Sequence, residues 1–192
     1  HRDLHSLRRR QRQMCIRDRY YNVLRLAESK AWSTPIFHGE LAAFRRELLE
    51  RLGGFPVDIG ADDSHTATKI ALMGYRAITP EITCSEIVPQ KGYHIWRIRR
   101  AQHLIQHFRK ILTMNPRTLK LFKTILHVET FLHILNPWIL LTAATFLLMS
   151  AIVGSILAVA LSALSIALLI YGSFRTWIIT QVYLIAATIR NI

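Results

Sequence analysis

The chain has 192 residues, of which 51% are hydrophobic, and its formal net charge is +13. This combination of apolar and basic composition is typical of a membrane protein with a cytoplasmic basic face. Its two cysteines, Cys15 and Cys84, give no basis for a disulfide-stabilised fold.

The first nineteen residues differ from the rest of the sequence. They lack apolar periodicity and contain seven arginines against two aspartates, a pattern typical of tails that bind nucleic acid or lipid. The run from Met14 to Arg19, however, matches the translation of a transposon-type sequencing adaptor, so we interpret residues 1–19 as non-native sequence and the chain as a C-terminal fragment. Without them the net charge of +13 falls by five to +8, and no nucleic-acid partner is expected.

Residues 20–114 contain alternating short helical and extended patterns. Helices are expected over 20–30, 46–52, 62–73 and 95–114, and strands over 41–44, 76–78 and 82–87. Asp62, Asp63 and Ser64 can cap the third of these helices, and Gly74 can end it. This order of elements predicts an α/β domain.

The C-terminal half predicts membrane-associated helices. Residues 115–136 form an amphipathic pattern typical of an interfacial helix. The 45 residues between Glu129 and Arg175 carry no Asp, Glu, Lys or Arg, and as helix they would extend about 67 Å, roughly twice the thickness of the hydrocarbon core. Two spans are therefore expected, at 137–153 and 156–171, within a C-terminal membrane region of 137–192 whose apolar segment 177–189 is either a third span or an interfacial helix.

Basic residues flank this pair of spans on both sides. The positive-inside rule then places both flanks, and with them residues 20–114, in the cytoplasm. The sequence predicts an integral protein of the inner or plasma membrane that contacts membrane lipids.

Several short motifs occur in an order that resembles glycosyltransferase family 2, the inverting enzymes of the GT-A fold. They are Phe37-His38-Gly39-Glu40, Ala43-Phe44-Arg45-Arg46, Gly53-Gly54-Phe55, Ala61-Asp62-Asp63, Gly74-Tyr75-Arg76 and Pro80-Glu81. The resemblance covers about residues 20–110 and, with the membrane segments, points to the cellulose- and hyaluronan-synthase-like members. It implies part of a Rossmann-like GT-A domain, and transfer of a sugar from a nucleotide sugar to a glycan or polyprenyl-phosphate acceptor.

The resemblance also implies that the acidic pair supplies the catalytic base. Inverting transfer to a hydroxyl needs one carboxylate within hydrogen-bond reach of that hydroxyl. Asp63 is the candidate base, and Asp62 the residue that orients it. Carboxylates at a helix start are also common caps that complement the helix dipole, which is the structural alternative for both residues.

Further substrate-binding residues follow from the same motifs. They are Phe37, Gly39, Glu40 and Arg45 near the start, and Trp96, Arg97, Arg99, Arg100 and Gln102 on the basic helix. The second group lies where processive members carry Gln-x-x-Arg-Trp, although the order of residues differs here. These arginines either neutralise the leaving diphosphate or attract anionic lipid, and both interpretations stay open.

An intact enzyme of this family is expected to use a divalent metal, Mg or Mn, held by an Asp-x-Asp motif in its donor-binding half. That motif is absent from the sequence, so no metal ligand is assigned and the fragment is expected to be inactive alone. His103 and His107 have the i, i+4 spacing of metal ligands but are interpreted as histidines of a polar helix face. The alternative to a transferase is a non-catalytic membrane-anchoring or scaffold protein with a basic interfacial helix.

Overall fold

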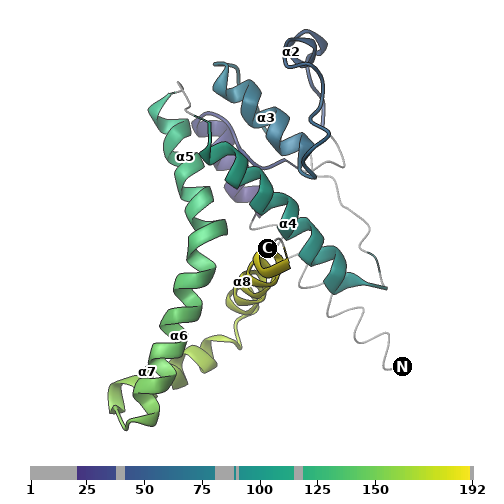
Figure 1. Ribbon diagram of the computed structural model, residues 1–192. Helices are drawn as coiled ribbons and strands as arrows, with labels where there is room; N and C mark the ends of the chain where they lie inside the picture. Colours follow the sequence, from purple (N-terminus) through teal and green to yellow (C-terminus); the bar gives the residue numbers. More distant parts are fainter. Residues whose placement is uncertain (1–20, 38–41, 81–88, 90, 115–118, 191–192) are drawn as a thin grey trace, which may run out of the picture.

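The computed structural model describes residues 21–37, 42–80, 89, 91–114 and 119–190, and all structural statements refer to these residues. They form a helix over 21–31 followed by α2 (Arg46–Arg51), α3 (Asp62–Leu72), α4 (Tyr93–Leu112), α5 (Lys120–Thr130), η1 (Phe131–Leu135), α6 (Asn136–Ile152), α7 (Ile156–Leu168) and α8 (Gly172–Arg190). Figure 1 shows α4 crossing the molecule between α3 and α8, beside the long helix that begins with α5.

The α/β prediction, and with it a Rossmann-like GT-A sheet, is wrong for the described residues, which contain no strand. The segment expected as a strand over 76–78 forms none, and the hydrogen bonds of its backbone at Ala77 are isolated ones. Thr34 N donates to Ala77 O at 3.0 Å, while Ala77 N donates to the Ser33 hydroxyl at 3.0 Å. A strand needs a ladder of such bonds between backbones, and here a serine side chain takes one backbone place.

Of the other two predicted strands, one is absent and one lies outside the described residues. Ala42 and Ala43, expected in a buried strand, are exposed and belong to no strand. The segment 82–87 lies outside the described residues.

Helix α3 agrees with its predicted bounds. Its N-cap position is Ala61 and no side chain caps it, so Asp62 and Asp63 lie in the first turn, where their charge complements the helix dipole. The helix ends before Gly74, whose φ of +92° lies in the left-handed region that favours glycine. Its next turns are almost wholly buried, which makes α3 a central element.

The core lies where α3, α4 and α5 meet. Its buried members are Ala67, Ala71, Ala77, Ile111, Phe122 and Leu126, with Trp32 and Phe37 packed against them. A second cluster of Ile105, Leu184 and Ala187 joins α4 to α8. The apolar segment predicted as a third span or an interfacial helix is therefore part of a helix that packs on the basic helix α4.

Helices α5, η1 and α6 are continuous over Lys120–Ile152, 33 residues or about 50 Å. Among the described residues, this helix is the one that is long and apolar enough to cross a membrane by itself. The junction is a π-helical turn at η1, just before Pro137. A proline has no N–H and its ring clashes with the carbonyl four residues earlier, here that of His133, so a wider turn relieves the clash.

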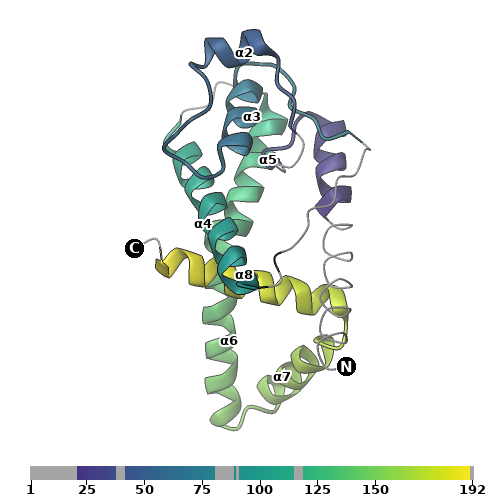
Figure 2. The ribbon, with the colours of Figure 1, turned by 90° about the vertical axis from the view of Figure 1, so that its right-hand side faces the viewer.

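After α6 the chain turns at Gly154, with φ of +95°, and α7 returns beside it. The Ser155 hydroxyl caps α7 by accepting a bond from Ala158 N at 3.4 Å. Helix α7 has 13 residues, about 20 Å, and meets α8 at a bend of 103°, so the two count as a further span only if taken as one broken helix. Figure 2 shows α7 rising from the lower end of α6, and α8 running across α6.

Candidate functional site

A pocket of about 500 Å³ lies between the start of α3, the first half of α4 and the middle of α8. The helix over 21–31 and the π-helical turn η1 complete its wall through Tyr21, Arg25 and His133. One side is acidic, with Asp62 and Asp63, and the facing helices supply arginine and aromatic side chains. The pocket therefore carries charged side chains of both signs among apolar ones, and it is built from segments far apart in the sequence.

The acidic side is held by α3 and the segment before it. Asp63 is half-buried, and its carboxylate accepts a bond from Ser64 N at 2.7 Å. Ser64 in turn accepts from Phe37 N at 2.9 Å, which fixes the start of α3 against that segment. Burial raises the pKa of Asp63, and the charge of neighbouring Asp62, which is exposed, acts in the same direction.

The basic side is held by contacts between α4 and α8. The Arg97 guanidinium lies 5.0 Å from the centre of the Tyr183 ring and donates to the Thr180 hydroxyl at 3.3 Å. The Arg100 guanidinium lies 4.9 Å from the centre of the Trp96 ring. These cation–π contacts hold both guanidinium groups in fixed orientations at the pocket wall.

Close packing at Gly60 sets the position of another wall residue, His103. A Cβ atom added at position 60 would overlap the imidazole ring of His103. Burial and the charge of Arg99 lower the pKa of His103, so the ring is neutral at pH 7. The loop before α3 therefore needs glycine at position 60 to leave room for this ring.

The pocket brings together many of the site residues predicted from sequence. Those that line it are Phe37, Asp62, Asp63, Trp96, Arg97 and Arg100. Arg99 is exposed outside it, Gln102 is half-buried but not part of its wall, and Arg45 is exposed beside a separate hollow of about 410 Å³. Gly39 and Glu40 lie outside the described residues. The roles assigned to all these residues remain predictions.

Sequence reasoning missed the contribution of α8, above all Thr180 and Tyr183. No local motif links residue 97 to residue 183, because their contact depends on how two helices pack. One signal was present: Gln181 and Tyr183 interrupt an otherwise apolar segment, and polar side chains in such a segment often mark a function.

The interpretation of His107 as a polar-face residue is wrong. It is fully buried, with its ring centre 5.6 Å from that of His65. Burial lowers the pKa of His107 to about 3 and that of His65 to about 4, so both are neutral. Within the described part of the chain, no group of three or more His, Cys, Asp or Glu side chains is placed to hold a metal ion. Asp62 and Asp63 thus do not amount to a divalent-metal site among these residues.

Comparison with known proteins places the chain in a family. Residues 5–189 match the model of glycosyl transferase family group 2, a range that includes most of the basic N-terminal run. The UDP-forming cellulose synthase catalytic subunit of Xanthomonas axonopodis pv. citri is 29% identical over 117 residues, which are 59% of this chain and 16% of that protein. The corresponding subunit of Komagataeibacter sucrofermentans is 34% identical over 93 residues, 47% of this chain and 12% of that protein.

A solved structure is also similar. The mannosyltransferase PcManGT from Pyrobaculum calidifontis, in complex with GDP-Man and Mn²⁺, is 63% identical, with a TM-score of 0.85 over 92% of this chain and 51% of that one. The chain thus spans about half of the mannosyltransferase and less than a fifth of the cellulose synthases. Because the family model matches nearly the whole chain, the predicted resemblance is confirmed: the chain belongs to glycosyl transferase family group 2.

Proposed function

We propose that the chain is the acceptor-side and catalytic-base part of a membrane-bound, inverting glycosyltransferase. The enzyme moves a sugar from a nucleotide sugar to a hydroxyl of a glycan or a polyprenyl-phosphate-linked acceptor. The observation that carries the proposal is the pocket itself, in which half-buried Asp63 shares a wall with Arg97, Arg100 and Trp96.

Asp63 is the general base. As the acceptor oxygen forms a bond to the anomeric carbon, its proton passes to the Asp63 carboxylate, and the bond from that carbon to the diphosphate breaks on the opposite face. The raised pKa makes this carboxylate a better proton acceptor, and the bond from Ser64 N fixes its orientation. Asp62, exposed beside it, raises the basicity of Asp63 through its charge.

The basic side stabilises the departing group. The nucleoside diphosphate leaves with increasing negative charge, which Arg97 and Arg100 neutralise more effectively in a pocket than they would in water. Their contacts with Tyr183 and Trp96 hold the guanidinium groups in place before the reaction. The Trp96 and Phe37 rings, both in the pocket wall, offer faces on which a sugar can stack.

The donor and the metal that we propose for the enzyme are taken from the similar mannosyltransferase, which was solved with GDP-Man and Mn²⁺. We take a guanosine diphosphate sugar as the first candidate donor. The described residues do not fit a divalent-metal site, so no step here is assigned to the metal, and its ligands are proposed to lie outside them. Bound to the donor, such an ion would neutralise charge on the diphosphate.

Membrane attachment is assigned to α6 and α7. The side chains of Phe146, Ile152 and Ile156 are 76%, 72% and 86% exposed, which suits contact with lipid and not with water. We propose that the hairpin of α6 and α7 enters the bilayer while α3 and α4 stay on the cytoplasmic side, close to a lipid-linked acceptor.

The experiment uses a chimera in which this chain replaces the corresponding half of the mannosyltransferase, so that the donor half is supplied. With GDP-Man and Mn²⁺, the Asp63→Asn chimera is expected to turn over about 100-fold more slowly, with unchanged thermal stability and donor affinity. Asp62→Asn is the matched control, and its turnover should fall less than tenfold. Near-normal transfer by the Asp63→Asn chimera would remove Asp63 as the base, and a scaffold without chemistry would give no transfer in any version.

A further inference from the structure

His133 is a pocket-lining residue that no local sequence motif marks. It lies in the π-helical turn η1, is 8% exposed, and contributes to the wall of the pocket of about 500 Å³. The buried positions of α5 lead to it, since Phe122, Leu126, Glu129 and His133 follow one another at the spacing of one helix face. The face that carries apolar side chains into the core thus carries His133 to the pocket.

The π-helical turn determines where His133 points. Asn136 N donates to the Phe131 carbonyl oxygen five residues earlier, where an α-helix would use the carbonyl four residues earlier. Such wide turns inside helices occur frequently at functional sites. This turn precedes α6, the helix assigned to the bilayer, so His133 lies at the end of the long helix's cytoplasmic part.

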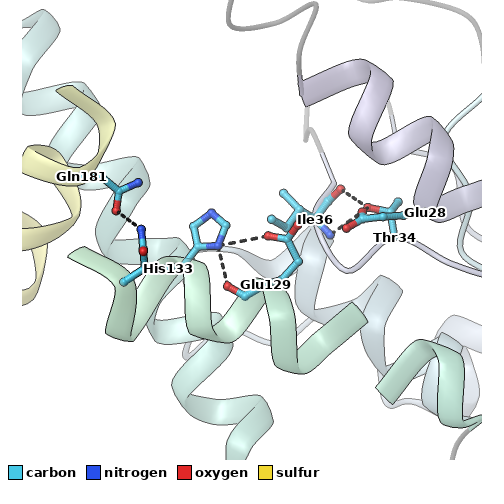
Figure 3. A network of polar contacts seen from close by, with 7 residues as sticks. Glu28, Thr34, Ile36, Glu129, His133 and Gln181 are labelled. Atoms are coloured by element: carbon cyan, nitrogen blue, oxygen red, sulfur yellow. Dashed lines mark hydrogen bonds and ion pairs between the residues drawn. The ribbon is translucent and has the colours of Figure 1, made fainter. Parts of the chain in front are cut away.

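Two contacts fix the imidazole ring of His133. Its Nδ1 is 2.8 Å from the Glu129 carbonyl oxygen and 3.2 Å from the carboxylate Oε2 of the same residue. The ring stacks on Phe108, with centres 5.2 Å apart and planes at 25°. Figure 3 shows the ring turned toward Glu129. A contact at one edge and a stack on one face leave the ring a single orientation.

The contact with the backbone assigns the hydrogen of the ring. A carbonyl oxygen can only accept a hydrogen bond, so Nδ1 of His133 is the donor. In the neutral imidazole the other nitrogen, Nε2, then carries a lone pair and acts as an acceptor. No group of the described residues bonds to Nε2, so this lone pair is the polar atom that the ring offers to the pocket.

The other histidines show that a hydrogen bond to the helix is not by itself a sign of function. His127 Nδ1 makes the same bond to the Lys123 carbonyl oxygen at 2.6 Å, but it is exposed on α5 outside the pocket. His65 and His107 are fully buried, and in the described part of the chain their ring nitrogens have no partner. His133 differs from all three because it combines a fixed ring with a place in the pocket wall.

The chemistry of the pocket defines what Nε2 can bind. Arg97 and Arg100 are donors that suit an anionic group. An uncharged acceptor suits a hydroxyl group, which can donate, whereas a phosphate oxygen would set one lone pair against another. The rings of Trp96 and Phe37 in the same wall suit a sugar ring, which is rich in hydroxyl groups. The pocket thus has separate groups for the charged and the uncharged parts of a substrate.

We propose that neutral His133, with its hydrogen on Nδ1, accepts a hydrogen bond at Nε2 from a hydroxyl group of the acceptor sugar. His133 is then a substrate-binding residue that selects the acceptor, because a site built around a hydroxyl rejects an analogue that lacks it. Glu129 is the positioning residue that keeps the ring in place. That the bound sugar is the acceptor rests on the proposed function, whereas recognition of a hydroxyl rests on the contacts of His133 alone.

Nitrogen NMR of the purified 192-residue chain tests this recognition without any activity. The chain carries isotope-labelled histidine and is held in a detergent without sugar groups. The His133 signals, identified by their loss in His133→Phe, are expected to show a hydrogen on Nδ1 and none on Nε2. Methyl glycosides of mannose, glucose and galactose are the probes, and at least one should shift the Nε2 signal.

Monodeoxy analogues of that probe then identify the hydroxyl group. The analogue that lacks the recognised hydroxyl should bind about tenfold more weakly, while the others bind nearly as well as the parent. A hydrogen on Nε2, no shift with any probe, or equal binding of all the analogues would overturn the inference.

Transfer kinetics in the same chimera test whether this contact serves the reaction. The donor is GDP-Man with Mn²⁺, and the acceptor is the methyl glycoside that binds. His133→Phe keeps a ring stacked on Phe108 and should raise KM for the acceptor about tenfold, with a smaller change in kcat. His133→Gln, whose amide oxygen can reach the place of Nε2, should restore most of the affinity. His133→Asn, whose amide reaches only the place of Nδ1, should not.

His127→Phe is the matched control, because it removes the same kind of backbone bond on the exposed side of the same long helix, and its KM should stay unchanged. Equal KM for His133→Phe and the wild type would remove His133 from acceptor binding. A wild-type chimera that transfers no sugar would reject the proposed function, while the NMR result would still decide whether His133 binds a hydroxyl group.

Discussion

The absence of a side chain at position 60 decides where a pocket residue lies. Gly60 is not in the left-handed region, so its requirement is one of space: the imidazole of His103 occupies the volume that a Cβ atom would take. Because His103 also lines the pocket, this contact links the loop before α3 to the face of α4 that carries Arg100.

Gly60→Ala is therefore expected to lower the free energy of unfolding by about 1–3 kcal/mol, since the added methyl group must displace the ring or the loop. Thermal unfolding in detergent measures the effect. The double variant Gly60→Ala with His103→Ala supplies the control, because removing the ring opens the space. If the double variant is no more stable than Gly60→Ala alone, the overlap with His103 is not the cause.

At this scale, sequence motifs singled out Asp62, Asp63 and Arg100, which line one pocket, while the roles predicted for them stay predictions. The two aspartates stand at the start of a helix, where a local capping pattern marks them. The motifs could not identify Arg25 or His133. Both belong to helices that meet the pocket only through tertiary packing, and neither stands in a recognisable local pattern.

Among the elements, helices were predictable and strands were not. The 3.6-residue period and the glycine at position 74 are local signals, and α3 ends within a residue of its predicted end. A strand is defined by its partner, and the segments near Ala43 and Ala77 have no backbone ladder among the described residues. The orientation of α8 likewise depends on its packing against α4, which no periodicity encodes.

The α4–α8 contact yields a prediction at this scale. The Tyr183 hydroxyl lies 2.7 Å from His94 Nδ1, and its ring lies beneath the Arg97 guanidinium. Tyr183→Phe keeps the ring and removes the hydrogen bond, so it should cost about 1 kcal/mol of unfolding free energy. Tyr183→Leu also removes the cation–π contact and should cost more.

Thermal unfolding in detergent ranks these two variants. Transfer by the chimera is expected to fall further for Tyr183→Leu than for Tyr183→Phe, because Arg97 loses the ring that orients it. Equal transfer rates for both variants would mean that the Tyr183 ring does not position Arg97.

The whole molecule combines a compact group of helices around α3 and α4 with a hairpin that carries its apolar side chains outward. Sequence reasoning located the turn of this hairpin correctly at Gly154, because a charge-free stretch of 45 residues and a Gly-Ser pair are visible without any structure. It did not foresee that α5 and α6 form one helix, since Asn136-Pro137 looks like a break. The π-helical turn absorbs the proline, so the amphipathic and apolar parts stay continuous.

This continuity gives a topology that labelling can test. Val153, at the tip of the hairpin, is 86% exposed, and Ser173 is exposed at the start of α8. In intact cells that express a version with Cys15 and Cys84 replaced by serine, a membrane-impermeant thiol reagent is expected to label Val153→Cys and not Ser173→Cys. The reason is the positive-inside rule, under which the arginines around α4 and at Arg175 are expected to stay on the cytoplasmic side, while the uncharged tip can cross at little cost.

Permeabilised cells provide the control, because both cysteines should then react. Labelling of Ser173→Cys alone in intact cells would invert the topology and place the pocket outside. Protection of both positions would mean that α6 and α7 form a re-entrant hairpin, which fits a helix α7 of only 13 residues, and the two-span prediction would then be wrong. Labelling at Val153 alone would show that 17 residues of α6 suffice, with the basic end of the long helix at the cytoplasmic surface.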